Sequence, residues 1–269
     1  MMIITPLHPQ TTRISSTDIQ PVYMGTAFDN LPPFPVYDKQ KPPEPGQDFS
    51  EGAVFLVDKP VSWSSFDVVK FLRGRLRVKK TGHAGTLDPL ATGLLIICAG
   101  RATKSIESFQ AYPKRYHGIA TLGASTPSQD AATEPDQQAP VDHIREEEIK
   151  KILSEKFTGV IRQIPPMYSA LWKDGKRLYS YARKGETVER EPRDAEVHEI
   201  RVISFGHGKL ELDVLCGKGT YIRTLVHDLG IALDSRAHLS QLRRTAIGPF
   251  QVQQALTIEQ LREIYSKPE

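Results

Sequence analysis

The sequence predicts an α+β fold with a largely antiparallel mixed sheet flanked by helices and loops, and three observations support this class. Short apolar runs typical of strands recur after residue 52, separated by turn signals. Segments with helical spacing lie among them without the regular strand–helix–strand alternation of a parallel sheet. Turn signals also join some neighbouring strands directly, as in antiparallel hairpins.

Residues 1–50 differ in composition from the rest of the chain. They hold nine of the 20 prolines, and three Lys or Arg against five Asp or Glu. Proline removes a backbone donor and resists helix and sheet, so we predict a Pro-rich extension that is disordered or extended. Order is expected to begin near Gly52. The main domain then spans 51–247, and 248–269 forms a short C-terminal segment.

The elements follow from local patterns. Apolar runs predict buried strands at 53–57, 94–99, 114–123 and 242–247. Helical spacing and capping residues predict a helix that begins at a Ser65 cap, helices at 145–157 and 220–233, and a last short helix capped by Thr257. A hairpin is predicted at Asp174-Gly175, since this pair suits a tight primed turn. A second joins 197–205 to 209–216, where apolar and acidic residues alternate.

The composition is that of an ordinary globular protein with a slight positive charge. Hydrophobic residues make up 39% and charged residues 25%, and the net charge is +3. Cys98 and Cys216 lie in apolar runs without the partner spacing of a metal or redox site, so we predict buried thiols and no metal site. No run approaches the ~18 apolar residues of a membrane span. We expect a cytoplasmic protein without membrane contact.

The most informative stretch is 81–95, where Asp88 lies among glycines, threonines and a proline. Glycines let the backbone approach a ligand closely, and Pro89 stiffens the turn. Five Lys or Arg and no acid lie just upstream, between Arg73 and His83. Taken singly, these features are ordinarily a capping Asp and a solvated basic face. Together they predict an acid directed into a phosphate-rich substrate.

The stretch 81–95 resembles the catalytic motif of the TruB family of RNA pseudouridine synthases. Further blocks are similar to the family's motifs in the same order: 57–60, the Lys-x-Tyr strand at 114–116, 164–185, 218–224 and 238–245. The resemblance covers roughly residues 52–247. It implies the pseudouridine synthase fold, isomerisation of uridine to pseudouridine, and a reaction without a cofactor.

The resemblance implies catalytic roles for three residues. Asp88 matches the family's catalytic aspartate, a nucleophile that holds an intermediate while the base is reattached through carbon. The residues allow attack on either the base or the sugar. Arg223 matches the arginine that pairs with this aspartate, and an adjacent cation keeps a carboxylate ionised. Tyr116 matches an active-site tyrosine that can stack on the extruded uracil or take part in proton transfer.

Further residues are predicted to contact or support the substrate. Tyr221 and Leu242 match positions that line the uridine pocket, and His83 matches a histidine that helps to displace the target base. Lys59 is expected to support the active-site loop, with an exposed lysine at a strand end as the alternative. Three basic residues are expected on RNA phosphates: Arg77, Lys79 and Lys80.

The chain departs from the family pattern at three places. Val61 replaces the glycine that follows the Lys-Pro pair, and the acidic loop at 125–130 keeps only Asp130 of its usual acids. Residues 248–269 have room only for the beginning of the PUA-type RNA-binding module that many members carry.

We expect a monomeric enzyme that acts without guide RNA on the T arm of tRNA. The target is the T-loop uridine conventionally numbered 55, flipped into the pocket. One alternative is the guide-RNA-dependent branch of the superfamily, which carries a full PUA domain. The other is a non-catalytic RNA-binding or tRNA-folding protein, against which the set of Asp88, Tyr116 and Arg223 argues.

Overall fold

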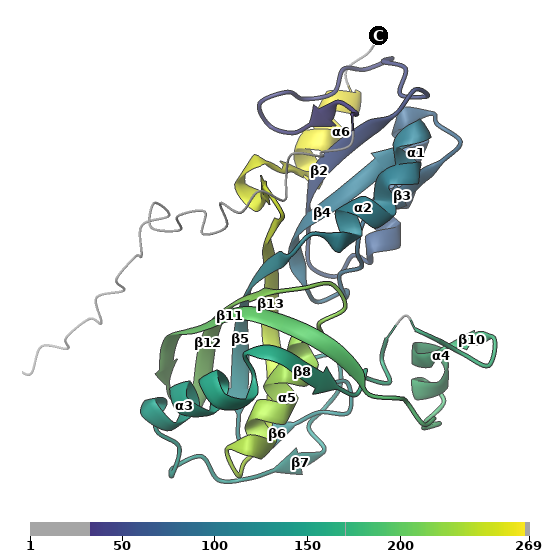
Figure 1. Ribbon diagram of the computed structural model, residues 1–269. Helices are drawn as coiled ribbons and strands as arrows, with labels where there is room; N and C mark the ends of the chain where they lie inside the picture. Colours follow the sequence, from purple (N-terminus) through teal and green to yellow (C-terminus); the bar gives the residue numbers. More distant parts are fainter. Residues whose placement is uncertain (1–32, 170, 267–269) are drawn as a thin grey trace, which may run out of the picture. The chain divides into compact units, whose positions relative to one another are not determined.

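A mixed β-sheet of 11 strands forms the centre of the protein (Figure 1). The structure, a computed structural model, describes residues 33–169 and 171–266; residues 1–32 of the predicted extension and Ala170 of the 164–185 block lie outside this description. The sheet runs in the order β1 (Val36–Tyr37), β2 (Ala53–Lys59), β4 (Thr92–Ala99), β13 (Ala237–Ile247), β5 (Lys114–Leu122), β12 (Lys209–Cys216), β11 (Arg193–Gly206) and β8 (Gly159–Gln163). Along this path β1–β2 and β4–β13 are parallel and the other neighbours are antiparallel. The predicted α+β class is confirmed.

Shorter elements complete the fold. Three strands pair with the main path: β3 (Thr81–His83) with β4, β14 (Phe250–Gln251) with β13, and β15 (Leu256–Thr257) with β2. Two separate pairs are β6 (Ala124–Ser125) with β7 (Gln137–Gln138) and β9 (Trp172–Lys173) with β10 (Lys176–Arg177). The helices are α1 (Ser65–Leu76), α2 (Ile106–Ala111), α3 (Glu146–Lys156), α4 (Leu178–Ala182), α5 (Ile222–Ala232) and α6 (Ile258–Ser266), with 3-10 turns at Gly100–Ser105 and Val252–Gln254.

Most local predictions are confirmed, and one cap is shifted by a residue. Ser64, not Ser65, caps α1: its hydroxyl accepts from the Asp67 amide at 3.1 Å, and the Asp67 carboxylate accepts from the Ser64 amide at 2.8 Å. The predicted cap of α6 is present, since the Thr257 hydroxyl accepts from the Gln260 amide at 3.2 Å. The turn between β9 and β10 has positive φ at both Asp174 and Gly175, as a primed turn requires.

Three apolar clusters fill the interior. The first packs α3 and α5 against β5 and β12. The second packs α1 and α6 against β2 and β4, and the third covers the other face of β2 and β4 with residues of α2 and β14. Cys98 and Cys216 are buried free thiols, as predicted, and burial raises the pKa of each to about 12. Among the residues that the structure describes, no helix has the length and apolar character needed to cross a membrane.

The parallel contact between β4 and β13 joins strands β1, β2 and β4 to strands β13, β5, β12, β11 and β8. It involves only two residue pairs, Arg243 with Thr92 and Arg244 with Gly93. Gly93 has a φ of +103°, and a Cβ there would lie 2.3 Å from the carbonyl oxygen of Arg244. The close approach of the two backbones therefore requires glycine at this position. The site described below lies beside this contact.

Both ends of the described chain pair with the sheet, which we did not predict. Order does not begin near Gly52, because β1 pairs with β2, and Tyr37 and Phe49 are buried against Phe55. Aromatic burial outweighs the proline content of this segment. At the other end, β15 pairs with β2 and Leu261 of α6 is fully buried. The segment predicted as the start of a PUA-type module therefore completes the core of the main domain.

Candidate active site

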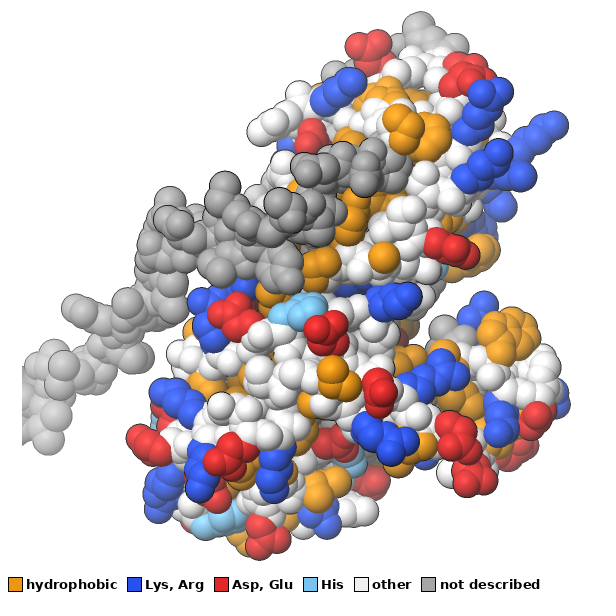
Figure 2. All heavy atoms as spheres, in the orientation of Figure 1, with side chains coloured by type: hydrophobic (Ala, Val, Ile, Leu, Met, Phe, Trp, Pro, Cys, Tyr) orange, Lys and Arg blue, Asp and Glu red, His pale blue; other side chains and the backbone are white. Residues whose placement is uncertain are grey.

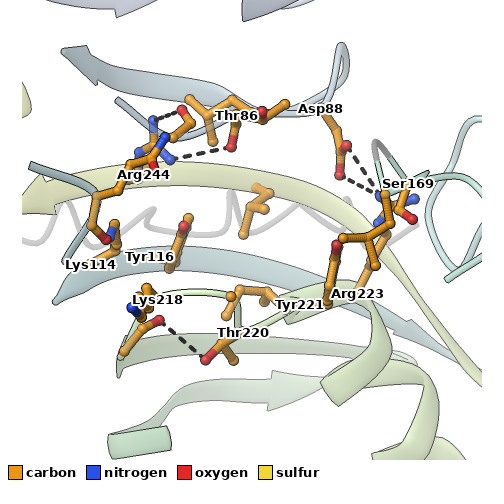
Figure 3. A pocket seen from close by; sticks show the side chains of 18 residues that line it. Thr86, Asp88, Lys114, Tyr116, Ser169, Lys218, Thr220, Tyr221, Arg223 and Arg244 are labelled. Atoms are coloured by element: carbon orange, nitrogen blue, oxygen red, sulfur yellow. Dashed lines mark hydrogen bonds and ion pairs between the residues drawn. The ribbon is translucent and has the colours of Figure 1, made fainter. Parts of the chain in front are cut away.

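A cavity of about 580 Å³ opens where β5, β13 and the loop before β4 meet the first turn of α5 (Figure 3). A volume of this size suits a small ligand group. Five of the residues predicted for the site line it: Asp88, Tyr116, Tyr221, Arg223 and Leu242. The fold thus brings the three predicted catalytic residues to one cavity, although they are far apart in the sequence.

The loop that carries Asp88 is held against α1. The Ser65 hydroxyl, which is not used in the cap, accepts from the Leu87 amide at 2.8 Å and donates to the Leu87 carbonyl at 3.1 Å. The Ser62 amide donates to the Pro89 carbonyl at 2.9 Å. Leu87 is buried, whereas the neighbouring Asp88 side chain keeps 38% of its surface exposed. These anchors on both sides of Asp88 direct its carboxylate into the cavity.

Arg223 pairs with Asp88 and links three loops. Its Nη2 lies 3.0 Å and 3.2 Å from the two carboxylate oxygens of Asp88, and it also donates to the Tyr168 carbonyl at 2.7 Å. Its Nη1 donates to the Ser128 carbonyl at 3.2 Å and lies 3.8 Å from the Asp130 carboxylate. The guanidinium is almost fully buried. Its position is therefore determined by several partners, and it in turn orients Asp88.

The protonation of Asp88 depends on two opposing effects. Loss of solvent around the carboxylate raises its pKa, and the Asp130 carboxylate adds to this increase. The positive charge of Arg223 counteracts both by favouring the ionised form. Arg223 is thus the main group that favours the ionised form of Asp88, and Lys59 adds a smaller contribution.

Two tyrosines and a leucine form apolar walls of the cavity. Tyr116 lies on β5, and burial raises the pKa of its phenol. Tyr221 precedes α5 and is fixed by Gln163, whose side chain exchanges hydrogen bonds of 3.0 and 3.1 Å with the backbone of Tyr221. Burial also raises the pKa of Tyr221. Both phenols are therefore neutral near pH 7, and with Leu242 they offer surfaces for a planar base.

Lys59 does not line the cavity. It is fully buried, and its ammonium group donates to the carbonyls of Pro60 at 2.9 Å, Trp63 at 2.6 Å and Pro89 at 3.3 Å. A buried ammonium held by three carbonyls cannot reach a substrate, so its assignment as a substrate-binding residue is corrected. The contact with Pro89 instead supports the loop that follows Asp88, and the alternative of an exposed strand-end lysine is wrong.

His83 also lies outside the cavity lining. It is the last residue of β3 and is half-buried. Burial and the charge of Arg244 lower the pKa of its imidazole, which is therefore neutral near pH 7. His83 can meet RNA only as a neutral group at the edge of the site, and its predicted contact with the substrate stays a prediction.

The basic residues upstream of β3 form an exposed surface. Arg77 ends α1 with a φ of 51°, and Lys79 and Lys80 are exposed in the connection to β3. Arg75 stacks on Phe71 at 3.6 Å. In Figure 2, Lys and Arg side chains gather beside α1, at the upper right. None of these residues lines the cavity, so phosphate binding there remains a prediction.

Sequence reasoning missed several residues that line the cavity: Lys114, Ser169, Lys218 and Arg244. Strand alternation offered a signal for two of them. Tyr116 was predicted for the site, so Lys114 two positions earlier on β5 shares its face. Leu242 was also predicted, so Arg244 two positions later on β13 shares its face. The register confirms this, since Arg244 lies directly opposite Tyr116.

Most of the chain matches models of a known protein family. A model of the TruB family pseudouridylate synthase N-terminal domain matches residues 73–222, and a model of the tRNA pseudouridylate synthase B C-terminal domain matches 223–268. The chain belongs to the TruB family. Both matched regions contribute to the cavity, because Tyr221 lies in the first and Arg223 in the second.

Two curated relatives are both named tRNA pseudouridine synthase B. The protein of Flavobacterium johnsoniae is 46% identical over 224 residues, which are 81% of this chain and 97% of the relative. That of Phocaeicola vulgatus is 47% identical over 221 residues, covering 80% of this chain and 94% of the relative. The similarity therefore extends over nearly the whole length of these TruB family proteins.

Solved structures support the same fold. A chain in a crystal structure of a Cbf5–Nop10–Gar1 complex matches with a TM-score of 0.63 and 28% identity over 88% of this chain. A chain in an H/ACA RNP bound to a substrate RNA containing 2′-deoxyuridine matches with a TM-score of 0.60 and 26% identity. This chain spans 60% of the length of each. The pseudouridine synthase fold is thereby established.

Proposed function

We propose that the protein isomerises uridine to pseudouridine in the T loop of tRNA, at the uridine conventionally numbered 55. One observation carries the proposal: among the described residues that line the cavity, Asp88 is the one acid, and Arg223 holds its carboxylate at 3.0 Å. Isomerisation breaks the bond from N1 to C1′ and forms one from C5 to C1′. The proton on C5 leaves, and N1 gains one.

Asp88 is the nucleophile of this reaction. A carboxylate that attacks the sugar or the base forms a covalent intermediate and divides a difficult exchange into two easier steps. Arg223 keeps the carboxylate ionised and oriented. Tyr116, Tyr221 and Leu242 surround the flipped base, and the cavity has room for a base but not for a paired duplex.

We propose action on tRNA without a guide RNA. The relatives named tRNA pseudouridine synthase B support it, because they match at 46–47% identity over almost their full length. The chains from H/ACA complexes match at lower identity and extend well beyond this chain. A monomer is proposed with it, because the three predicted catalytic residues of a single chain already meet at one cavity.

The test uses an unmodified tRNA transcript without guide RNA, incubated with the purified protein and mapped for pseudouridine. We expect one modified position, in the T loop. A transcript in which that uridine is replaced by cytidine serves as the control and should remain unmodified. Modification only after a guide RNA is added would favour the guide-dependent branch, and RNA binding without modification would favour a non-catalytic protein.

A further inference from the structure

Arg244 is a buried cation at the cavity wall that has no carboxylate partner among the described residues. Its side chain is 1% exposed. Nε donates to the Leu94 carbonyl at 2.8 Å, Nη1 to the Thr86 carbonyl at 3.4 Å and Nη2 to the Gly85 carbonyl at 3.1 Å. Buried charges are normally paired with an opposite charge, because desolvation is costly. A guanidinium held by carbonyls, with no carboxylate partner among the described residues, leaves its positive charge available to the cavity.

Arg244 contacts both the strand that carries Tyr116 and the loop that carries Asp88. It lies directly opposite Tyr116 on the neighbouring antiparallel strand, so both side chains project from the same face. Its bonds to Gly85 and Thr86 hold the loop that reaches Asp88 two residues later. Figure 3 shows Arg244 near Thr86 and Tyr116 on one side of the cavity and Asp88 on the other.

The charges in the cavity are unevenly placed. Lys114 and Lys218 lie at the same end as Arg244 (Figure 3), whereas Asp88 is already paired with Arg223. Lys114 is itself held by the carbonyls of Gln110 and Tyr112, without a carboxylate among the described residues. The end of the cavity that faces Tyr116 therefore carries excess positive charge.

The proposed reaction produces negative charge that this end could stabilise. If Asp88 attacks C1′, the N1–C1′ bond breaks and its electron pair stays on the uracil ring. If Asp88 attacks C6, the electrons of the C5–C6 double bond move toward the C4 carbonyl. Both routes place negative charge on uracil. A fixed cation that needs no reorganisation is the usual way for an enzyme to stabilise such charge.

We propose that Arg244 takes part in the isomerisation: its guanidinium stabilises the negative charge on the uracil ring and holds Tyr116 and the Asp88 loop around the base. This inference rests on the proposed function. Uracil charge develops only during the reaction, so Arg244 acts on the rate of the chemical step more than on RNA affinity.

The test compares Arg244→Gln, which removes the charge, with Arg244→Lys, which keeps it. Arg115→Gln is the matched control, because Arg115 is also buried, on β5, but projects from the opposite face and pairs with Asp213 at 2.6 Å. Single-turnover rates at saturating tRNA and the Kd for tRNA are measured for each, after thermal melting shows that it is folded. We expect a rate about 100-fold lower for Arg244→Gln, with Kd within about threefold of wild type. Arg244→Lys should stay within about tenfold of the wild-type rate.

The outcomes separate the two proposals. If the wild type makes no pseudouridine in tRNA, the proposed function fails. If the wild type is active, a normal rate for Arg244→Gln, or equally slow Gln and Lys variants, would overturn the role of the Arg244 charge. If Arg244→Gln does not fold, the folded Lys variant decides: a loss of about 100-fold or more there would show that positive charge at this position contributes little.

Discussion

At the scale of single residues, Asp88 and Arg223 determine how the site responds to pH. Desolvation raises the pKa of Asp88 and Arg223 counteracts it. A nucleophilic carboxylate must be ionised, so the rate should fall as the pH drops through the pKa of Asp88. The lower limit of the pH–rate profile therefore reports the balance between these two effects.

Replacing Arg223 with Gln should move this lower limit to higher pH. The substitution removes the larger of the two positive charges that favour the carboxylate, so Asp88 would be protonated at a higher pH than in the wild type. The measurement is the pH dependence of the single-turnover rate. Arg201→Gln, which removes an arginine that pairs with Glu199 on β11, is the control. A lower limit that stays in place would contradict the assigned role of Arg223.

Lys59 should make stability depend on pH in the alkaline range. Burial lowers its pKa to about 8 from an ordinary 10.5. Between these values the unfolded chain holds a proton that the folded protein has lost, so the free energy of unfolding rises with pH. The slope from this residue is at most about 1.4 kcal/mol per pH unit.

Urea unfolding between pH 8 and 10 tests this. Wild type should gain stability relative to Lys59→Met, which lacks the titrating group. The contribution of Lys114, whose pKa is also lowered to about 8, is common to both proteins and cancels. Lys151→Met, at an exposed position on α3, should behave like the wild type. Parallel curves for wild type and Lys59→Met would show that the ammonium group keeps its proton in the folded state.

At the scale of elements, the segment before β2 is part of the core. Phe49 is 3% exposed and packs edge-on against Tyr37 and Phe55. Phe49→Ala should lower the free energy of unfolding by about 3–5 kcal/mol, because it leaves a cavity among aromatic rings. Phe66→Ala, at an exposed position of α1, should change it by less than about 0.5 kcal/mol. If Phe49→Ala and Phe66→Ala changed the free energy of unfolding equally in denaturant titrations, residues 33–51 would not stabilise the fold.

The exposed basic surface at the end of α1 should affect RNA affinity. Neutralising Arg77, Lys79 and Lys80 together should weaken tRNA binding and flatten its salt dependence, by roughly 0.7–0.9 in the slope of log affinity against log salt for each lost phosphate contact. The single-turnover rate at saturating tRNA should change far less, since phosphate contacts position the RNA. Unchanged affinity and salt slope would remove these residues from the RNA-binding surface.

Elements with a strong local pattern could be predicted from the sequence. The spacing of Val68, Leu72 and Leu76 predicts α1, and Asp174-Gly175 predicts the β9–β10 turn. Strand β1 could not be predicted, because two residues have no period and their pairing with β2 depends on distant contacts. Both Ser64 and Ser65 are suitable cap residues, but Asp67 lies three residues after Ser64 and forms the reciprocal capping box with it. Ser65 instead contacts Leu87.

At the scale of the whole molecule, the site depends on contacts between distant parts of the chain. The loop of Asp88 precedes β4, Tyr116 lies on β5, and Leu242 and Arg244 lie on β13 between them in the sheet. The family resemblance predicted Asp88, Tyr116 and Arg223 without this knowledge. The burial of Lys59, and the lack of a carboxylate partner for Arg244 within residues 33–169 and 171–266, could not be predicted, because both follow from the order of strands and from which carbonyls surround them.

If Asp88 is the nucleophile of this tRNA pseudouridine synthase, the reaction requires its carboxylate. The most direct measurement compares wild type with Asp88→Asn on an unmodified tRNA transcript, recording both pseudouridine formation and the Kd for tRNA. Amide and carboxylate are close in size, so the variant should bind tRNA nearly as well as the wild type and form no pseudouridine, because the amide cannot act as the nucleophile. Repeated turnover by Asp88→Asn would show that Asp88 is not the nucleophile.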